Sequence, residues 1–208
     1  MKKQRFLGRR SPTSKIIHFP SVKCNELKYC ESRLEYDRLL QLEFDKNVTY
    51  YEAQPDPIYY TNHNGRNVRY TPDLRVVASD GAFFFEEIKP YEKSIVPNTL
   101  RKHSLIASIY ESDSISFKIV TEKDIYVGKR NENHRKLYRY LSEPISQPVK
   151  SALEDDLAEF CGPLCQLIEI LSQRGYEAQV VMQLLAHSLL RFNIAEELTL
   201  NTEVAWHE

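Results

Sequence analysis

The chain has 208 residues, of which 42% are hydrophobic and 27% are charged, and its formal net charge is −1. This length allows one domain with a sizeable core and a small second unit. No apolar run approaches the roughly 20 residues of a membrane-spanning helix, and residues 1–20 lack the hydrophobic region of a signal peptide. We therefore expect a cytoplasmic protein that has no membrane partner.

Charge is distributed unevenly along the chain. Residues 1–23 contain seven Lys or Arg and no acid, whereas residues 151–208 contain ten acids against Arg174 and Arg191. Residues 24–150 carry nineteen charges of each sign. A basic amino-terminal arm suits a phosphate backbone, although a solvated tail has the same composition. The acidic carboxy-terminal region would be repelled by nucleic acid, so we expect its partner to be a protein.

A helix is predicted over residues 32–44, the segment SRLEYDRLLQLEF. Leu39, Leu42 and neighbouring apolar residues are spaced to form a stripe on one helical face. Ser32 suits the N-cap position, and Glu35 three residues later completes the pattern of a capping box.

The next part of the chain consists of predicted strands and one more helix. The strands cover residues 48–55, 56–62, 67–77, 81–89 and 115–125, and the helix covers residues 98–113. The turn NHNG joins the second and third of these strands as a hairpin. Asn98 is the expected N-cap of the helix, directly after Pro97. This order predicts an α/β fold whose mixed central sheet is flanked by helices.

The carboxy-terminal part is predicted to form a small, mostly helical domain. Two helices are expected over residues 153–172 and 177–190, followed by short strands at residues 198–200 and 203–206. Two helices and a hairpin are the outline of a winged-helix-like module.

The predicted domain organisation has four parts. A basic arm covers residues 1–23, an α/β domain residues 24–141, a linker residues 142–151 and the winged-helix-like domain residues 152–208. The linker is placed by the two prolines of SEPISQPVKS.

Two acidic residues interrupt predicted strands that are otherwise apolar. Asp73 follows Pro72 in the second strand of the hairpin, and Glu87 lies near the end of the next strand. Strands joined by a short turn run antiparallel, so their pairing would bring the two carboxylates together. Glu87 and Lys89 are two residues apart, so their side chains leave the same face of a strand.

Two carboxylates with a lysine beside them can serve phosphodiester hydrolysis. Mg²⁺ is often held by one or two carboxylates together with waters and a phosphate oxygen. The lysine can then contact the attacking water or the scissile phosphate, where its charge offsets the charge of the transition state. The alternative is a pair of surface strand ends joined by a salt bridge.

The Pro-Asp pair and the Glu-x-Lys segment resemble the motif of the restriction-endonuclease-like superfamily. More specifically, SRLEYDRLLQLEFDKNVTYYEAQP, YTPDL and EEIKP together resemble the TnsA family, the endonuclease subunits of heteromeric bacterial transposases. The resemblance covers about residues 20–125. It implies that residues 24–141 form a catalytic domain with a restriction-endonuclease-like core.

The resemblance also implies roles for individual residues. Glu35, Asp73 and Glu87 would be catalytic residues that bind Mg²⁺, with Mn²⁺ as a substitute, and Lys89 would be the fourth catalytic residue. Some TnsA proteins have glutamine where Glu87 stands, so the glutamate gives the fuller superfamily motif. Gln54 matches a glutamine common in the family and would orient water or phosphate, or else cap a strand end. Without the family, Glu35 reads as part of a capping box.

Candidate DNA contacts are basic residues outside this set. They are Arg9, Arg10 and Lys15 in the arm, and Arg101 and Lys102 on the second predicted helix.

The TnsA resemblance implies a place in cut-and-paste DNA transposition. TnsA-type subunits cut the 5′ strands at transposon ends, while a DDE transposase partner (TnsB-like) cuts and joins the 3′ strands. The family also implies contact with an AAA+ regulator (TnsC-like), for which the acidic region after residue 150 is the candidate surface. Such a protein would be associated with the bacterial nucleoid when it acts on double-stranded DNA.

Two other functions fit the same sequence. A stand-alone nuclease of the superfamily, acting in restriction or repair, would cleave DNA without a partner. A non-catalytic adaptor would bridge transposase and regulator. The presence of both acidic strand residues, the lysine and the helical glutamate argues against an adaptor.

Overall fold

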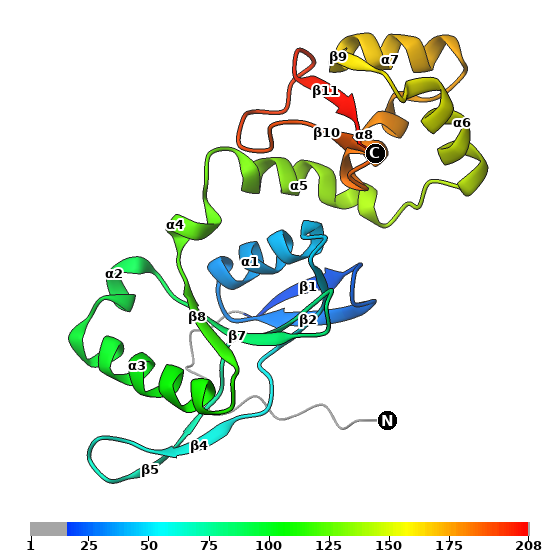
Figure 1. Cartoon of the computed structure of the whole chain (residues 1–208). Coiled ribbons are helices and arrows are strands. Elements are labelled where there is room, and N and C mark those ends of the chain that lie inside the picture. The colour runs from blue at the N-terminus through cyan, green and yellow to red at the C-terminus, as the bar shows by residue number, and fades with distance from the viewer. Residues whose placement is uncertain (1–15, 208) are drawn as a thin grey trace. The chain divides into compact units, whose positions relative to one another are not determined.

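The computed structural model describes residues 16–207 and divides into two units (Figure 1). The first unit contains the described residues up to 39 and residues 47–121, and the second contains residues 40–46 and those from 122 onward. The boundary therefore falls inside helix α1 (Arg33–Phe44). None of the described helices is long and apolar enough to cross a membrane.

The first unit is built on a four-stranded mixed sheet. Its elements are β1 (Ile17–Ser21), β2 (Glu26–Cys30), the first part of α1, β3 (Val48–Ala53), β4 (Ile58–Thr61), β5 (Asn67–Tyr70), β6 (Leu74–Ala78), β7 (Phe83–Ile88), α2 (Tyr91–Ser94), α3 (Pro97–Ser112) and β8 (Ser116–Val120). The sheet order is β3-β6-β7-β8, with β8 parallel to β7 and the other pairs antiparallel. The predicted α/β fold with a mixed central sheet is confirmed.

The predicted long strand over residues 67–77 is two strands. Strand β5 pairs with β4, whereas β6 pairs with β3 and β7 in the central sheet. The break falls at Thr71, Pro72 and Asp73, because proline has no N–H to donate to a ladder. The hairpin β4–β5, which the turn NHNG predicts, is therefore an insertion between two neighbouring strands of the sheet.

An aromatic cluster joins this hairpin and α3 to one face of the sheet. Tyr70 and Tyr110 are buried, and Phe85 and Phe117 pack against them. The ring centroids lie 4.5 Å apart for Phe85 and Tyr110 and 5.7 Å apart for Tyr110 and Phe117. Aromatic contacts of this kind add to the free energy of area burial. The cluster fixes the position of the hairpin against the sheet.

Several predicted boundaries in this unit are wrong. Helix α3 begins at Pro97 with Val96 as N-cap, not Asn98, because proline is favoured in the first helical turn. Residues 17–21 form strand β1, although the predicted arm had no regular structure. The last strand of the first unit, β8, ends at Val120, and residues 122–125 form a short helix of the second unit and not the end of a strand.

The second unit combines helices with a three-stranded sheet. Its elements are α4 (Glu122–Ile125), α5 (Arg130–Leu141), α6 (Gln147–Leu157), β9 (Cys161–Pro163), α7 (Leu164–Gln173), α8 (Ala178–Ala186), β10 (Leu190–Arg191) and β11 (Glu203–Trp206), together with the last residues of α1. The sheet order is β10-β11-β9 and both pairs are antiparallel. This arrangement fits the expected winged-helix-like module.

The helices of the second unit differ from the sequence prediction. The single helix expected over residues 153–172 is α6 and α7 separated by β9, which contains Gly162 and Pro163. The strand expected at residues 198–200 is irregular chain. The unit begins at residue 122, earlier than the predicted linker over residues 142–151, and α6 already begins inside that linker.

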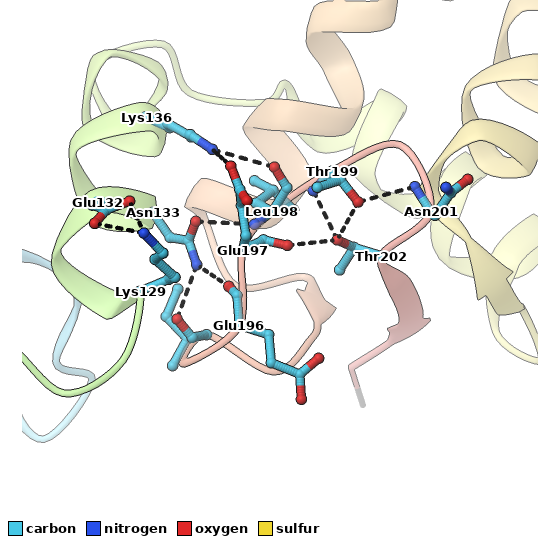
Figure 2. A network of polar contacts seen from close by, with 11 residues as sticks. Lys129, Glu132, Asn133, Lys136, Glu196, Glu197, Leu198, Thr199, Asn201 and Thr202 are labelled. Atoms are coloured by element: carbon cyan, nitrogen blue, oxygen red, sulfur yellow. Dashed lines mark hydrogen bonds and ion pairs between the residues drawn. The ribbon is translucent and has the colours of Figure 1, made fainter.

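Helix α5 explains why the second unit begins before the predicted linker. It packs against α8, and its Leu137 lies in the core of the second unit with 1% of its surface exposed. Asn133 of the same helix is fully buried and holds the segment between β10 and β11 (Figure 2). Its amide nitrogen donates to the carbonyls of Ile194 and Glu196 at 2.9 and 2.6 Å, and its oxygen accepts from the N–H of Leu198 at 3.2 Å.

His134 makes the stability of the second unit depend on pH. Its ring stacks on Phe44 with centroids 4.4 Å apart, and its Nδ1 has no hydrogen-bond partner within residues 16–207. Burial and the charge of Arg130 lower the pKa of His134 from 6.5 to about 4. The unfolded chain thus binds a proton below pH 6.5 that the folded unit does not, and stability present above pH 6.5 is lost toward pH 4.

We expect the free energy of unfolding of the second unit to be about 1 kcal/mol lower at pH 5.5 than at pH 7.5 because of His134. Trp206, the only tryptophan of the chain and buried in this unit, reports the transition by fluorescence in urea. His134→Gln should remove this part of the pH dependence, whereas His187→Gln should keep it. Identical pH dependence in His134→Gln and the natural chain would contradict the assignment.

Candidate functional site

The register of β6 and β7 places Asp73 and Glu87 opposite each other. The ladder ends at the pair of Leu74 and Glu86, and Asp73 and Glu87 are the residues directly beyond that end on the two chain segments. Directly opposed residues of an antiparallel pair have their side chains on the same face of the sheet. The two carboxylates thus lie on the face that α3 and the hairpin β4–β5 cover, next to Phe85.

Glu87 is surrounded by hydrogen-bond donors. Its Oε2 accepts from the hydroxyl of Tyr70 at 2.6 Å, and its Oε1 lies 2.9 Å from Nζ of Lys89. Nε2 of His103 lies 3.4 Å from the same Oε1, at the outer limit of a hydrogen bond. Burial by itself would raise the pKa of Glu87, but His103, Tyr70 and Lys89 lower it to about 2. Glu87 is therefore a buried, ionised carboxylate.

Asp73 has the opposite protonation preference. Its Oδ2 accepts from the N–H of Ile88 at 2.6 Å, and its Oδ1 makes no hydrogen bond to any described residue. Burial and the charges of Glu87 and Glu35 raise the pKa of Asp73 to about 8. The pair of carboxylates thus retains one proton near neutral pH, and Asp73 carries it. A cation between them would favour the doubly ionised form.

Glu35 completes the predicted capping box at the start of α1. Its Oε1 accepts from the hydroxyl of Ser32 at 2.7 Å, and its Oε2 accepts from the N–H of Glu31 at 2.9 Å. In return, the N–H of Glu35 donates to the hydroxyl of Ser32 at 3.1 Å. Burial and the charges of Glu31 and Glu87 raise the pKa of Glu35. Glu35 therefore caps its helix and also contributes to the charge around Glu87.

Backbone hydrogen bonds fix Lys89 directly after β7 and Gln54 directly after β3. The N–H of Lys89 donates to the carbonyl of Val120 at 2.9 Å, and the N–H of Gln54 donates to the carbonyl of Asp73 at 2.8 Å. Gln54 has a left-handed backbone with φ of 48°. Such a conformation costs about 1 kcal/mol in a residue other than glycine and is frequent at functional sites.

Sequence reasoning missed the roles of Tyr70 and His103. His103 follows the candidate DNA contacts Arg101 and Lys102 in the sequence, but it is buried with 5% exposure. The missed signal is helical spacing, because His103, Ile106 and Tyr110 recur on the buried face of α3. Nothing local to Tyr70 indicates its bond to Glu87, since that contact depends on how the hairpin folds back.

Glu86 and Glu87 have separate roles on the two faces of β7. Glu86 is 1% exposed and binds Arg38 of α1 through two hydrogen bonds, Nε to Oε2 at 2.8 Å and Nη2 to Oε1 at 2.6 Å. This bidentate pair joins α1 to the face of the sheet opposite Glu87.

The basic residues predicted to contact DNA lie in two parts of the chain. Arg9, Arg10 and Lys15 lie outside the described residues. Arg101 is exposed on α3. Nζ of Lys102 lies 4.5 Å from the ring centroid of Tyr70, so this lysine is next to the site.

Residues 45–122 match the family described as TnsA-like endonuclease N terminal. The chain carries a TnsA-like endonuclease domain. The matched segment contains Gln54, Asp73, Glu87 and Lys89 but not Glu35. A search of curated proteins finds no match.

The TnsA-like domain does not contain a ready-made site with three ligands. Within residues 16–207, no group of three or more His, Cys, Asp or Glu side chains is arranged to hold a metal ion. The donor set fits a cation that takes few protein ligands, because Asp73 and Glu87 are opposed and Oδ1 of Asp73 is available. Mg²⁺ is often bound through one or two carboxylates and completes its shell with waters and phosphate oxygens.

The two adjacent glutamates should respond differently to the same substitution. Glu86→Gln leaves the partly buried guanidinium of Arg38 without its counter-charge, so we expect the free energy of unfolding to fall by about 2 kcal/mol. Glu87→Gln removes a charge from a site held by Tyr70, and we expect a change within about 1 kcal/mol. Urea unfolding followed by circular dichroism measures both. Equal losses in the two variants would contradict this division.

The substitution Gln54→Gly should distinguish the role of the backbone at this position from the role of the Gln54 side chain. Glycine adopts a positive φ without strain, so Gln54→Gly should stay within about 0.5 kcal/mol of the natural free energy of unfolding. If the amide contacts substrate, both Gln54→Gly and Gln54→Ala should cleave DNA at least about tenfold more slowly. Full activity in both variants would show that the side chain of Gln54 has no part in the reaction.

Proposed function

We propose that the protein is a metal-dependent DNA endonuclease subunit of a transposase, which hydrolyses the 5′ strands at transposon ends. The observation that carries the proposal is the opposition of Asp73 and Glu87, with Lys89 on Glu87, inside a TnsA-like endonuclease domain. Placing two carboxylates and a lysine at one point of a largely apolar sheet has a cost in burial free energy, and phosphodiester hydrolysis gives this arrangement a use.

Asp73 and Glu87 are the residues that would hold Mg²⁺ or Mn²⁺. When bound, a divalent cation lowers the pKa of a bound water and offsets charge on the phosphate. The hydroxyl of Tyr70 donates to Glu87 and fixes the orientation of its carboxylate, while Nε2 of His103 lies 3.4 Å from Oε1 without a hydrogen bond. Glu35 adds negative charge at the end of α1, beside Glu87.

Lys89 is placed to act on the phosphate. Its side chain is 26% exposed and its Nζ lies 2.9 Å from Oε1 of Glu87, so the lysine lies between the buried carboxylate and solvent. A cation in this position stabilises the negative charge that develops on the phosphate in the transition state. A divalent cation held by Glu87 would compete with this ion pair and would leave Lys89 able to contact the phosphate.

The partners proposed from the TnsA resemblance are a DDE transposase and an AAA+ regulator. The near-neutral charge of residues 24–150 favours a partner that supplies most of the recognition of the transposon ends. The acidic residues after position 150 favour a protein and not DNA as the partner of the second unit. A stand-alone nuclease of the same superfamily is the second candidate function, and a non-catalytic adaptor is the third.

Metal binding tests the site without any partner. We expect calorimetry to detect Mn²⁺ binding to the natural chain that Asp73→Asn and Glu87→Gln both abolish, because each variant removes one of the two carboxylates. Glu111→Gln, an exposed glutamate at the far end of α3, is the matched control and should bind as the natural chain does. Binding that survives both site substitutions would show that the carboxylates do not form one metal site.

Strand-specific cleavage distinguishes the three functions. A duplex that carries the transposon end is labelled separately on each strand and incubated with Mn²⁺, with and without the transposase and regulator. Cleavage of the 5′ strand only with the partners supports the proposal, and cleavage without them supports a stand-alone nuclease. An intact 5′ strand in every mixture, with transposition unaffected by Glu87→Gln, supports the adaptor.

A further inference from the structure

The hairpin β4–β5 has two chemically different faces. Its register pairs Ile58 with Tyr70 and Tyr60 with Val68, and this face packs on the aromatic cluster of the first unit. The opposite face carries two other pairs, Tyr59 with Arg69 and Thr61 with Asn67. All four residues of this outer face are exposed, and Figure 1 shows the hairpin extending from the sheet beside α3.

The outer face is cationic and contains no acid. No Asp or Glu occurs between Asp56 and Asp73, whereas Arg66 and Arg69 both lie in this segment. Their guanidinium groups are exposed and form no ion pair or hydrogen bond with any residue that the structure describes. Two unpaired arginines on an acid-free ribbon favour a polyanionic partner.

Tyr59 gives this surface an aromatic group. Its side chain is 74% exposed, the highest exposed fraction among the large hydrophobic residues that the structure describes as exposed. Its neighbours on the outer face are Thr61, Asn67 and Arg69, so the surface is not an apolar patch of the kind that proteins dock on. An isolated tyrosine between arginines and hydrogen-bonding side chains is suited to the sugars and bases of a nucleic acid.

The turn of the hairpin is rigid, which fixes the position of Arg66. The side-chain oxygen of Asn62 accepts from the N–H groups of Asn64 and Arg66 at 3.0 and 3.1 Å. Gly65 supplies the positive φ of 72° that the turn requires, and its N–H donates to the carbonyl of Asn62 at 2.9 Å. Less conformational entropy is therefore lost when this segment binds.

The hairpin is attached directly to the candidate site. Strand β5 ends at Tyr70, whose hydroxyl holds Glu87, and Asp73 follows three residues later. Asp73 is the fourth residue after Arg69, which is a span of at most about 13 Å. Since each nucleotide of a DNA strand rises about 3.4 Å, Arg69 can reach phosphates within about four nucleotides of a scissile bond at the carboxylates.

We propose that the outer face of the hairpin β4–β5, with Arg66, Arg69 and Tyr59, binds the phosphate backbone of the DNA next to the bond that is cut. This inference rests on the proposed function and names the element that holds the substrate. A two-stranded ribbon is narrow enough to enter the major groove, and its arginines face outward toward the phosphates. The contact is independent of base sequence and positions the strand over the carboxylates.

Salt-dependent binding tests the proposal on the full chain. The probe is a fluorescent 30-base-pair duplex, and its anisotropy is measured at several NaCl concentrations without divalent metal. Each of Arg66→Ala and Arg69→Ala should lower the slope of log K against log salt by about 0.9, and the double variant by about 1.8. Tyr59→Ala should weaken binding severalfold without changing the slope.

Lys118→Ala is the matched control. Lys118 is an exposed cation of the same unit but pairs with Glu86, on the face of the sheet opposite Glu87. The slope of log K against log salt for Lys118→Ala should therefore be nearly that of the natural chain. Circular dichroism melting verifies that each variant is folded, which is expected because the substituted side chains are exposed.

The outcomes separate this inference from the proposed function. Slopes that do not change in the arginine variants, or no binding of the duplex by the natural chain at low salt, would overturn the hairpin contact. Reduced slopes in the arginine variants support the hairpin contact, independently of the results for metal binding and DNA cleavage. If the hairpin variants reduce the slopes while the natural chain binds no metal and cuts no DNA, the hairpin contact stands and the nuclease function fails.

Discussion

The antiparallel register between β6 and β7 is the constraint on which the candidate site depends. Because Leu74 pairs with Glu86, Asp73 meets Glu87 on one face while Glu86 meets Arg38 on the other. A shift of one residue would exchange the two faces of β7 and place Glu86, in place of Glu87, on the face of Asp73. The apolar residues on both faces and the bidentate arginine contact oppose such a shift, so the packing of the core also specifies the geometry of the chemistry.

The two carboxylates differ because their surroundings differ. Glu87 has the hydroxyl of Tyr70, the ammonium of Lys89 and the imidazole of His103 around it, whereas Asp73 has one backbone N–H and faces negative charge. Their pKa values consequently move apart, and one proton remains on the pair. In the proposed function a divalent cation would replace this proton, and the hydroxyl of Tyr70 would still hold Glu87. The support comes from the hairpin and from α3, two elements that the aromatic cluster holds together.

Local patterns predicted the elements well and their contacts poorly. The capping box of Ser32 and Glu35, the hairpin turn and the central strands follow from nearest-neighbour chemistry, which the sequence displays directly. The bond from Tyr70 to Glu87 depends on tertiary packing, and no local pattern contains it. The break at Pro72 was readable from its missing N–H, but an apolar run on both sides favoured one long strand. Helix α5, whose Leu137 joins the second core, is strongly polar overall and gave no sign of its partner.

The hairpin between β3 and β6 leaves and re-enters the sheet at nearly the same point. The N–H of Gln54 and the carbonyl of Asp73 meet at 2.8 Å, so the intervening segment is closed at its base by the sheet itself. Doubling the length of a flexible closed loop costs only about 0.6 kcal/mol. The segment can therefore be lengthened, shortened or replaced with little loss of stability, while Asp73 and Glu87 stay in place in the sheet.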